Sequence, residues 1–509
     1  MERKIRVRFA PSPTGGLHLG GVRTVLYNYL FAKQQGGDFV LRIEDTDQSR
    51  YVPGAEDYIY QTLAWCGLQP DESPKHGGAY GPYRQSERKE MYRNYAETLV
   101  VRGQAYYAFD TAEELDAMRA SQRTDENTAP QYDHRVRMQM RNSLALSKDE
   151  IDTLLSAQTP HVIRIKMPEG ETVSFTDMIR GDIRFDTATL DDKVLLKADG
   201  MPTYHLAVVV DDYLMQITHA FRGEEWLPNA PVHVLLWQYL FGLEHMPQWA
   251  HLPLILGPNG KLSKRDGTTY GFPVFASTWT DNNTGDVTEG FKERGFLPQA
   301  FVNLLAMLGW NAGTEQEIYS IDDLVQQFTI EKVHKGGAHF DFEKAKWFNH
   351  EWIKRLDAKT LLPDVKPYFE QRGLAITDDA FLEKVILLVK DRCTLLPDFV
   401  EQGAFFFKAP SALDESAVKA KWNKGKRTFF EAFIDAASGS DWTATTLETI
   451  FKQKAESANI KPGELQLPLR IMLVGGKFGP PVFEIAAALG VAETRARITD
   501  ALEKFDALL

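Results

Sequence analysis

The sequence predicts an α/β fold with a parallel sheet, followed by a helical region in the last part of the chain. Residues 5–10 (IRVRFA) and 39–45 (FVLRIED) have strand patterns, and a helical pattern closed by Gly36-Gly37 lies between them. Residues 109–197 mix a helical pattern with short strands, and apolar residues recur with helical spacing from about residue 356 onward, for example in EKVILLVKDRCTLL (383–396). KVLLKADGMPTYHLAVVVDD (193–212) has a strand-like pattern, and the polar stretch STWTDNNTGDVTEG (277–290) is expected to be a loop. A strand–helix–strand unit implies parallel strands, with ligands bound at their carboxyl ends.

The composition is that of an ordinary globular protein, with 43% hydrophobic and 25% charged residues. Lys and Arg total 58 against 70 Asp and Glu, and this net charge of -12 argues against a protein that coats nucleic acid non-specifically. It leaves local phosphate contacts open. No apolar run is long enough to span a bilayer, and the first residues contain no apolar signal core. We therefore expect a cytoplasmic protein without membrane association.

The first chemical motif is PSPTGGLHLGG at 11–21, between the first strand and the first helix. Small residues let a backbone approach a phosphate closely, and the start of a helix supplies free N–H groups. His18 would lie beside the phosphates, where an imidazole donor can stabilise charge that develops as pyrophosphate leaves. A plain strand-to-helix turn explains the glycines equally well, so this motif alone indicates a phosphate site only weakly.

The second motif is KLSKR at 261–265, which follows the turn GPNG. Lys261 and Lys264 on a loop suit mobile cations that close on a triphosphate, because lysine binds phosphate as a point charge. An isolated string of this kind is more often a solvated basic loop. Its meaning therefore depends on the first motif.

Together the two motifs resemble the signatures of class I aminoacyl-tRNA synthetases. The family's His-Ile-Gly-His is similar to His18-Leu19-Gly20-Gly21, without the second His, and its Lys-Met-Ser-Lys-Ser is similar to residues 261–265. Further stretches resemble the bacterial glutamyl-tRNA synthetases over nearly the whole chain. They are RFAPSPTGGLHLGG (8–21), RIEDTDQSRYVPGAE (42–56), GPYRQSER (81–88), ADGMPTYHLAVVVDD (198–212), FRGEEWLPNAPVH (221–233), FDFEKAKWFN (340–349) and LPLRIMLVGGKFGPPVFEI (467–485).

This resemblance implies a Rossmann-type catalytic domain that is split by an inserted α+β domain. The two catalytic halves are expected at 1–108 and 198–257, with an acceptor-end-binding insert at 109–197. A connector that carries KLSKR is expected at 258–355, and an α-helical anticodon-binding region at 356–509.

The resemblance also implies a glutamate site. Its members would be Arg8, Ser12, Glu44, Tyr204 and Arg222. A receptor for glutamate needs an anion near the amine and cations for the carboxylates, and arginine suits planar carboxylates. We assign Glu44 to the α-ammonium, Arg8 to the side-chain carboxylate and Arg222 to a substrate carboxylate. Tyr204 would add a hydroxyl donor, whereas Val208 stands where several relatives have Asn.

Each of these assignments has a plainer alternative. Arg8 suits a cross-strand ion partner within IRVRFA, and Glu44 suits a helix-cap or solvent role within EDTD. Asp45 and Asp47 could bind a hard cation as paired carboxylates, although in this family Mg²⁺ arrives chiefly on ATP.

For catalysis the resemblance implies four residues, which are His18, Gly20, Lys261 and Lys264. The ATP-binding set would add Glu225, Trp226 and Ser263. The only cysteines, Cys66 and Cys393, form neither a disulfide framework nor a Cys-based zinc site. Some family members hold zinc near the start of the insert, but the corresponding AYYAFDTAEEL lacks cysteine, so we expect no zinc and no protein-held metal.

The tRNA surface is predicted from two features. Arg392, in VKDRCTLL, falls where discriminating bacterial enzymes have an arginine associated with the last anticodon base. The basic run KAKWNKGKR at 419–427 suits a phosphate contact, and a solvated helix end explains it about as well.

The resemblance implies the activity of a ligase. L-glutamate and ATP would give glutamyl-adenylate, and glutamate would then pass to the terminal adenosine of tRNA(Glu). We expect a monomer. Glutaminyl-tRNA synthetases share the fold but have tails that resemble β-barrels, and glutamyl-queuosine enzymes end before an anticodon domain. A non-catalytic tRNA-binding paralogue would have eroded motifs, whereas His18, Gly20, Lys261 and Lys264 are present.

Overall fold

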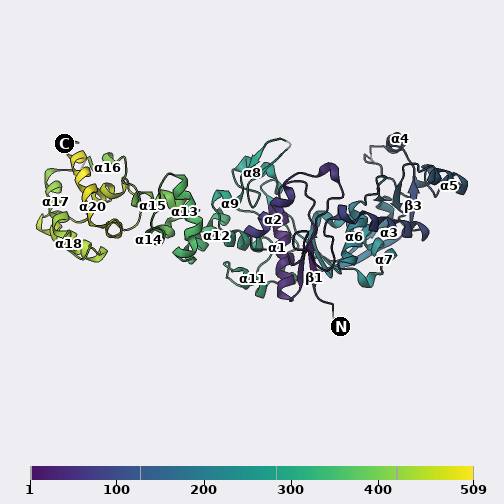
Figure 1. The fold of residues 1–509 in the computed structure, drawn as a ribbon, viewed down its shortest axis with the longest axis horizontal. Coiled ribbons are helices and arrows are strands. Elements are labelled where there is room, and N and C mark those ends of the chain that lie inside the picture. Colours follow the sequence, from purple (N-terminus) through teal and green to yellow (C-terminus); the bar gives the residue numbers. More distant parts are fainter. Residues whose placement is uncertain (1–2, 126–127, 283, 420–421, 508–509) are drawn as a thin grey trace. The chain divides into compact units, whose positions relative to one another are not determined.

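The computed structural model describes residues 3–125, 128–282, 284–419 and 422–507. The chain divides into two compact units. Unit 1 comprises Met1–Glu293 and Phe301–Phe342, and unit 2 comprises Arg294–Ala300 and Glu343–Leu509. Figure 1 labels many of the helices of both units and the strands β1 and β3.

Unit 1 is built on a six-stranded sheet. Its order is β2 (Asp38–Leu41), β1 (Arg6–Phe9), β8 (His219–Gly223), β9 (Gln248–Leu252), β5 (Thr172–Asp177) and β6 (Gly181–Asp186). The first five strands run parallel, and β6 pairs with β5 in the antiparallel direction. Helix α1 (Leu19–Gln34) connects β1 to its parallel neighbour β2 and packs on β1, β2 and β8. The predicted strand–helix–strand unit is confirmed.

Strand β1 is buried along its whole length, although its sequence alternates apolar and basic residues. Alternation ordinarily marks a strand with one solvent-facing side. Here the two arginines are buried because each has carboxylate partners: Arg6 pairs with Asp38 and Glu72, and Arg8 pairs with Asp212. Buried charges need such partners, so the alternation reflects a polar network under the sheet.

The strand-like pattern predicted across 193–212 is wrong for its second half. Only β7 (Val194–Leu196) is a strand, and α6 (Tyr204–Leu214) is a helix that includes the run of three valines. Valine costs a helix only a few tenths of a kcal/mol relative to good helix formers. Residues 206–212 are all buried, and such a helix needs no polar face. Tyr204 is therefore the first residue of a helix.

A second, antiparallel sheet joins β3 (Ala105–Ala108), β4 (Val162–Ile165) and β7. Helices α4 (Ala112–Gln122) and α5 (Lys148–Ser156) belong to the same stretch of chain, and α4 begins with a capping box between Thr111 and Glu114. Residues 109–197 thus contribute β4 and β7 to this sheet and β5 and β6 to the large one. The five-region division of the chain stays a prediction.

The remaining elements up to residue 342 are short. They are α2 (Ala55–Trp65), α3 (Lys89–Val101), α7 (Ala230–Leu240), β10 (Ile255–Gly257), β11 (Gly260–Lys261), α8 (Lys264–Tyr270), β12 (Trp279–Thr280), β13 (Val287–Thr288), α9 (Phe291–Arg294), α10 (Pro298–Met307), α11 (Ile321–Gln327) and β14 (Ala338–His339). The stretch 277–290 was predicted to be a loop, but β12 and β13 pair within it as a short hairpin. Residue 283 lies outside the described residues.

Unit 2 is helical. Its helices are α12 (Phe342–Arg355), α13 (Ala358–Gln371), α14 (Asp379–Val389), α15 (Asp398–Gly403), α16 (Glu415–Lys419), α17 (Lys424–Ala437), α18 (Ala444–Ser457), α19 (Gly463–Val474) and α20 (Val482–Asp506). The described residues after 356 contain no strand, so the predicted helical region is confirmed. Helix α14 ends earlier than its apolar pattern indicated, because Lys390–Arg392 form a 3₁₀ turn. A search of the described helices found none with the length and apolar character of a membrane span.

Candidate active site

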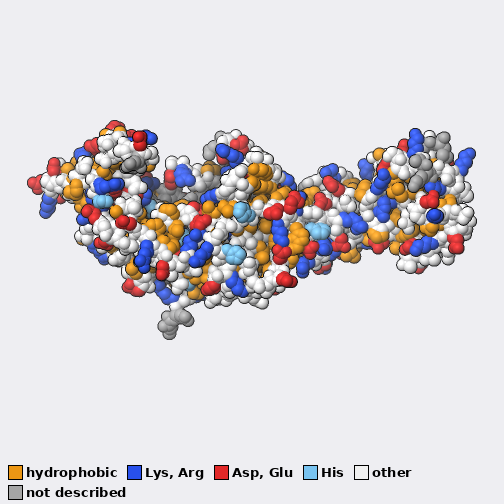
Figure 2. Space-filling model, turned by 180° about the vertical axis from the view of Figure 1, so that it is seen from behind, with side chains coloured by type: hydrophobic (Ala, Val, Ile, Leu, Met, Phe, Trp, Pro, Cys, Tyr) orange, Lys and Arg blue, Asp and Glu red, His pale blue; other side chains and the backbone are white. Residues whose placement is uncertain are grey.

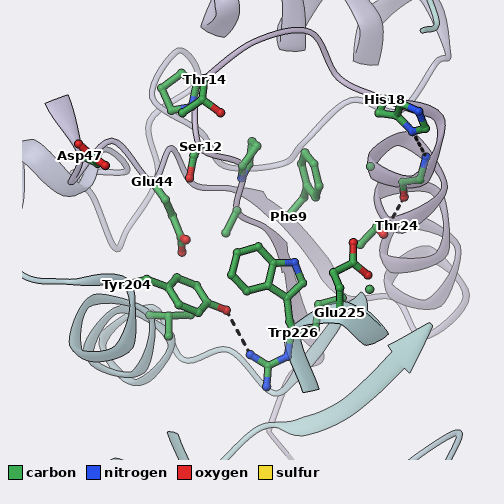
Figure 3. Close-up of a pocket in the computed structure, with 18 of the residues that line it drawn as sticks. Phe9, Ser12, Thr14, His18, Thr24, Glu44, Asp47, Tyr204, Glu225 and Trp226 are labelled. Atoms are coloured by element: carbon green, nitrogen blue, oxygen red, sulfur yellow. Dashed lines mark hydrogen bonds between the residues drawn. The ribbon is translucent and has the colours of Figure 1, made fainter. Parts of the chain in front are cut away.

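A cavity of about 910 Å³ lies in unit 1, where the carboxyl ends of the parallel strands meet the start of α1. Ten of the predicted site residues line it: Arg8, Ser12, His18, Gly20, Glu44, Tyr204, Arg222, Glu225, Trp226 and Lys261. Ser263 and Lys264 do not. In Figure 3 Ser12, Glu44 and Tyr204 lie toward one side of the cavity, and His18 lies toward the other.

A buried network of charges forms the wall of the cavity next to β1 and β2. Arg8 donates from Nε and Nη2 to the two carboxylate oxygens of Asp212, at 3.2 and 3.1 Å. Arg42 donates to Asp212 at 2.8 Å and to Glu44 at 2.9 Å. Burial raises the pKa of Asp212, but the charges of Arg8 and Arg42 prevail and hold that pKa below its ordinary value. Asp212 therefore stays ionised as the shared partner of two arginines.

Glu44 is the anion that this wall presents to the cavity. Its Oε1 accepts from Arg42 Nη2, and Gln85 Nε2 approaches the same oxygen at 3.5 Å. Among the described residues, Oε2 has no hydrogen-bond partner. Burial raises the pKa of Glu44 in spite of Arg42 and Arg8 nearby, so its carboxylate would gain from a further cation.

The sequence analysis missed the residues that anchor this network. Asp211 and Asp212 end the stretch VVVDD, and Gln85 and Arg88 belong to GPYRQSER. Asp211 accepts from Arg88 Nε at 2.7 Å and from Gln85 Nε2 at 2.9 Å. Both stretches were singled out by resemblance, but no role was assigned to their charged residues. Two adjacent aspartates directly after an apolar run were the signal that could have identified Asp211 and Asp212.

Arg222, near the end of β8, also lines the cavity. Its Nη1 donates to the Tyr204 hydroxyl at 3.2 Å, a contact drawn as a dashed line in Figure 3. The same nitrogen lies 3.3 Å from His233 Nδ1, and Nε donates to His251 Nε2 at 2.9 Å. Nη2 is buried without a hydrogen-bond partner. Arg222 thus retains an unused donor beside the cavity. Val208 lines the same cavity and offers no amide there.

Trp226 and Glu225 lie in a 3₁₀ segment, Glu224–Asn229, that follows β8 directly. The Trp226 ring is 42% exposed, and its centroid is 4.9 Å from that of Tyr204. An exposed indole on a cavity wall is a surface on which a planar ring can stack. A core role for this tryptophan is therefore excluded by its exposure.

His18 is the N-cap of α1, and its Nδ1 accepts from the backbone N–H of Gly20 at 3.5 Å. A neutral imidazole that accepts at Nδ1 carries its proton at Nε2. Nε2 is buried without a partner, so it is an unsatisfied donor at the start of a helix. Burial, together with the charges of Lys261 and Lys264, lowers the pKa of His18 to about 4. The ring is therefore neutral near pH 7.

The two lysines of KLSKR are exposed, in contrast to the buried arginines. Lys261 ends β11, and its Nζ lies 3.0 Å from Glu225 Oε1. Ser263 is the N-cap of α8 in a capping box with Asp266, so its hydroxyl is engaged there. Lys264 starts α8, and its Nζ lies 5.2 Å from the centroid of the Phe275 ring. Neither Ser263 nor Lys264 reaches the cavity wall in this conformation.

The glycines of the first motif differ in what they permit. A Cβ at Gly16 would lie 2.8 Å from the Trp279 ring, so a side chain there would collide with the protein. A Cβ at Gly20 would meet no atom within 4 Å, yet Gly20 lines the cavity. Its missing side chain thus leaves room in the cavity itself. Gly21, where the family motif has its second His, would bring a Cβ within 2.5 Å of Leu17 Cδ1.

The alternative in which Asp45 and Asp47 bind a hard cation is not supported by the contacts of Asp45. Both of its carboxylate oxygens are occupied, since Oδ1 accepts from Ser86 N at 2.8 Å and Oδ2 from Ser86 Oγ at 2.6 Å. Within the described part of the chain, no group of three or more His, Cys, Asp or Glu residues is arranged to hold a metal ion.

The predicted tRNA-contacting residues lie in unit 2. Arg392 is exposed at the end of the 3₁₀ turn after α14. Burial lowers the pKa of Arg470, and the positive charge of Arg392 lowers it further. In the basic run 419–427, Trp422 is buried and donates to Asp506 at 3.1 Å. Arg427 also contacts Asp506. These contacts favour a folded helix end, and residues 420–421 lie outside the described residues. On the face in Figure 2, acidic and basic side chains are intermixed.

Comparison with known proteins shows that nearly the whole chain is similar to one family of enzymes. Residues 4–347 match the family model described as "tRNA synthetases class I (E and Q), catalytic domain", and residues 360–502 match "Anticodon binding domain". The curated glutamate–tRNA ligase of Christiangramia forsetii is 49% identical over 506 residues, which cover 99% of each chain. That of Amoebophilus asiaticus is 48% identical and covers 99% of this chain and 98% of its own.

Solved structures agree with this similarity. A crystal structure of a glutamate tRNA ligase from Elizabethkingia meningosepticum, in complex with its amino acid, superposes with a TM-score of 0.93 at 47% identity. It covers 99% of this chain and 100% of its own. The glutamate-tRNA synthetase of Elizabethkingia anophelis gives a TM-score of 0.91 at 47% identity and covers 98% of this chain and 100% of its own.

Proposed function

Because the chain belongs to the class I tRNA synthetases for glutamate and glutamine, we propose that it activates L-glutamate with ATP and charges tRNA(Glu). It is an aminoacyl-tRNA synthetase with a class I catalytic domain and a helical anticodon-binding domain. The observation that carries the proposal is one cavity with an anion and a cation at one side and a buried imidazole donor at the other. These are Glu44, Arg222 and His18.

The reaction has two steps. In the first, the α-carboxylate of glutamate attacks the α-phosphorus of ATP, forming glutamyl-adenylate and releasing pyrophosphate. In the second, the 2′-hydroxyl of the terminal tRNA adenosine attacks the glutamyl carbonyl, and AMP leaves. Neither step needs a nucleophile from the protein, so catalysis consists of positioning and electrostatic stabilisation.

The glutamate side of the cavity is Glu44, Arg8, Ser12, Tyr204 and Arg222. Glu44 has one oxygen without a partner and a raised pKa, and both features suit a substrate ammonium. Arg222 has a donor without a partner, which suits a carboxylate. Ser12 lines the cavity and exposes its hydroxyl there. Tyr204 already accepts from Arg222, so its own proton is left for the substrate.

The ATP side is His18, Gly20, Glu225, Trp226 and the lysines of KLSKR. The Nε2–H of His18 and the start of α1 both favour a phosphate oxygen, and Gly20 leaves the space for it. Trp226 offers its exposed face to the adenine or ribose. Lys261 leaves Glu225, and Lys264 moves toward the cavity, when the triphosphate binds. Mg²⁺ enters with ATP.

Selectivity for glutamate over glutamine needs a cation whose charge is compensated by the carboxylate of glutamate but not by the side-chain amide of glutamine. Shape cannot separate two nearly isosteric side chains, but a buried guanidinium facing an amide stays poorly compensated. Arg8 already binds both oxygens of Asp212, whereas Arg222 has no carboxylate within 4 Å among the described residues. Arg8 was assigned to the side-chain carboxylate, and this difference makes Arg222 the competing discriminator.

One set of variants decides between the two arginines. Arg8→Gln and Arg222→Gln are assayed with glutamate and with glutamine at saturating tRNA. The discriminating arginine is the one whose loss lowers kcat/KM for glutamate much more than for glutamine. A folded Arg8→Gln variant that keeps its preference for glutamate would pass the role to Arg222, and thermal melts identify variants that merely unfold.

The activity itself is tested by ATP–pyrophosphate exchange with glutamate, with and without tRNA(Glu), followed by charging of tRNA(Glu). Glutamate-dependent exchange that requires tRNA(Glu) is the expected result. Exchange with glutamine in preference to glutamate would support glutaminyl-tRNA synthetase activity, although the described residues after 356 contain no strand, which speaks against it. The absence of any exchange or charging would contradict the proposal.

The tRNA is expected to contact several parts of the chain. We propose that residues 109–197 bind the acceptor end, that 258–355 contact the stem and that Arg392, within 356–509, reads the anticodon. A monomer in the cytoplasm fits these roles.

A further inference from the structure

Three side chains on three adjacent strands form a hydrogen-bonded chain that leads to the cavity. Arg222 on β8 stands directly beside His251 on β9 in the register of the sheet, and Asp177 ends the next strand, β5. His251 Nδ1 lies 2.6 Å from Asp177 Oδ2, and His251 Nε2 accepts from Arg222 Nε at 2.9 Å. His251 and Asp177 do not line the cavity.

The chemistry of the three groups fixes the position of the ring proton. A guanidinium can only donate, so His251 Nε2 must be the unprotonated nitrogen. The proton therefore sits on Nδ1 and is donated to Asp177. Burial lowers the pKa of His251 although Asp177 opposes this. Burial raises the pKa of Asp177, but the interaction with His251 and the backbone N–H groups of Arg180 and Ile179 together prevail and hold it below its ordinary value. The chain thus consists of a carboxylate, a neutral imidazole and a guanidinium.

Asp177 is itself rigidly held. Its Oδ1 accepts from the backbone N–H groups of Ile179 at 3.0 Å and Arg180 at 2.9 Å, and Oδ2 also accepts from the backbone N–H of His251 at 3.1 Å. The carboxylate is therefore fixed by the backbone of the turn between β5 and β6 and by that of β9 before it orients the imidazole. A second neutral ring, His233, contacts Nη1 of Arg222, so nitrogen acceptors and the Tyr204 hydroxyl surround this guanidinium.

This arrangement orients Arg222 without neutralising it. Arg8 is held by a carboxylate that takes up its charge, whereas the described residues place no carboxylate within 4 Å of Arg222. Asp177, the carboxylate at the end of this hydrogen-bonded chain, acts through an uncharged ring. A guanidinium held in this way keeps its charge for a ligand, and its geometry is set before the ligand arrives.

We infer that Asp177 and His251 are positioning residues for substrate binding: they fix the imidazole tautomer that accepts from Arg222 and so hold Arg222 ready for the carboxylate of the amino acid. The inference rests on the proposed function, because it takes Arg222 to be the group that meets this carboxylate.

Asp177→Asn tests the tautomer directly. The amide has nearly the same shape as the carboxylate, but its NH₂ group can donate to His251 Nδ1, which would move the ring proton to Nε2 and set two donors against each other. We expect KM for glutamate to rise by about 10- to 100-fold, the loss that corresponds to one hydrogen bond to a charged group. KM for ATP and for tRNA(Glu) should change by less than about threefold, on the order of the spread of neutral variants.

A matched control is Asp192→Asn. Asp192 is also a buried aspartate of unit 1 that accepts from an arginine (Arg137), a tyrosine (Tyr106) and a backbone N–H, but it lies away from the cavity. Its variant should lose stability without a selective change in KM for glutamate. Equal changes in KM for glutamate and ATP in Asp177→Asn, or the same kinetic profile in both variants, would overturn the inference.

Variants of His251 keep the inference testable if Asp177→Asn does not fold. His251→Gln can keep an acceptor near the position of Nε2, whereas His251→Leu removes it. The inference predicts that Gln restores part of the glutamate affinity that Leu loses, and equal KM values for glutamate in both folded variants would contradict it. A wild-type chain that fails to charge tRNA(Glu) would contradict the proposed function and, with it, the premise of the inference.

Discussion

The two ends of the cavity use charge in opposite ways. At the end proposed for the amino acid, called the amino-acid end, Arg8, Arg42, Asp212 and Glu44 are buried and joined by hydrogen bonds of 2.8 to 3.2 Å. At the end proposed for the triphosphate, called the phosphate end, the cations are exposed lysines on β11 and α8. Lys261 pairs with the exposed Glu225, and Lys264 does not line the cavity.

This difference matches what each end has to do. A site that must tell a carboxylate from an amide needs charges whose positions are set before binding, and a buried, hydrogen-bonded network provides them. A site that must accept a triphosphate and release pyrophosphate needs cations that can approach and withdraw. Lysine on an exposed segment meets that need, because it binds phosphate without a fixed geometry. The predictions below test this contrast, starting with the largest expected effect.

Removing the shared anion of the amino-acid end should have the largest effect. In Asp212→Asn, Arg8 and Arg42 lose the carboxylate to which both donate, and two buried guanidinium groups are left undercompensated. We expect the free energy of unfolding to fall by about 3–5 kcal/mol, as when one partner of a buried ion pair is removed. Urea unfolding measures it.

The control for this variant is Asp116→Asn, which breaks an exposed ion pair with Arg119. It should cost less than about 1 kcal/mol. Similar losses in the two variants would mean that the buried network contributes no more than a surface pair, and the contrast between the two ends would fail.

Many of the elements and residues behind this contrast could be predicted from the sequence, but the partners that hold those residues could not, for a physical reason. Strand β1, helix α1 and the helical tail follow from local periodicity, and the resemblance pointed to Arg8, Glu44 and Arg222. The partner of Arg8 lies 204 residues away on α6, a segment whose valines suggested a strand. Pairing at such a separation depends on strand order, which periodicity does not contain.

The same reason explains why the hydrogen bonds from Arg222 through His251 to Asp177 could not be predicted from the sequence. The three residues are neighbours only because β8, β9 and β5 are adjacent in the sheet. The role of Ser263 was also predicted without its capping box, although the spacing of Ser263 and Asp266 is a capping signal in the sequence. Motifs identified residues that line the cavity, whereas the groups that hold those residues in place could be found only from the fold.

At the phosphate end, Lys264→Ala should lower adenylate formation sharply although this lysine is exposed and off the cavity wall. Its ammonium is expected to meet charge that moves onto pyrophosphate, worth roughly 2.7–4 kcal/mol if it acts like a preorganised oxyanion donor. Pre-steady-state pyrophosphate exchange measures the effect, while tRNA binding should stay nearly unchanged.

A matched control is Lys75→Ala. Lys75 is exposed and lies 4.0 Å from the centroid of the Tyr60 ring, much as Lys264 lies over Phe275. Neither lysine lines the cavity, but Lys75 lies outside KLSKR. If Lys264→Ala stayed within about threefold of the wild type, as expected for a neutral surface change, exposed lysines would not supply the catalytic charge.

The anticodon prediction extends the contrast to unit 2, where Arg392 is exposed like the lysines. Arg392→Gln should relax discrimination between tRNAs that differ at the last anticodon base, by roughly 1–3 kcal/mol if the contact is bidentate. Charging kinetics with both tRNAs measure it, with Arg372→Gln as an exposed control in the same unit. An equal loss for both tRNAs would indicate a phosphate contact or a folding defect instead.

His18 is a buried titratable group at the phosphate end, and its pKa of about 4 gives stability a defined pH dependence. The unfolded chain binds this proton at the ordinary histidine value of about 6.5, so the contribution is complete above that pH and is lost as the pH falls toward 4. We expect wild type to lose roughly 1–2 kcal/mol more than His18→Gln between pH 7 and pH 5. Equal losses would show that the imidazole titrates normally.

The smallest effect on stability should come from the exposed ion pair at the phosphate end. Lys261 and Glu225 lie 3.0 Å apart, but their side chains are 57% and 42% exposed. Water screens such a pair and both side chains lose rotamer freedom in forming it, so Glu225→Gln should change the free energy of unfolding by less than about 1 kcal/mol. The same variant should change KM for ATP, because Glu225 lines the cavity and holds Lys261 away from a triphosphate. Urea unfolding and ATP titrations on one preparation separate the two quantities. A loss of stability as large as that of Asp212→Asn would contradict the contrast, since a pair that is needed for folding could not also open for the substrate.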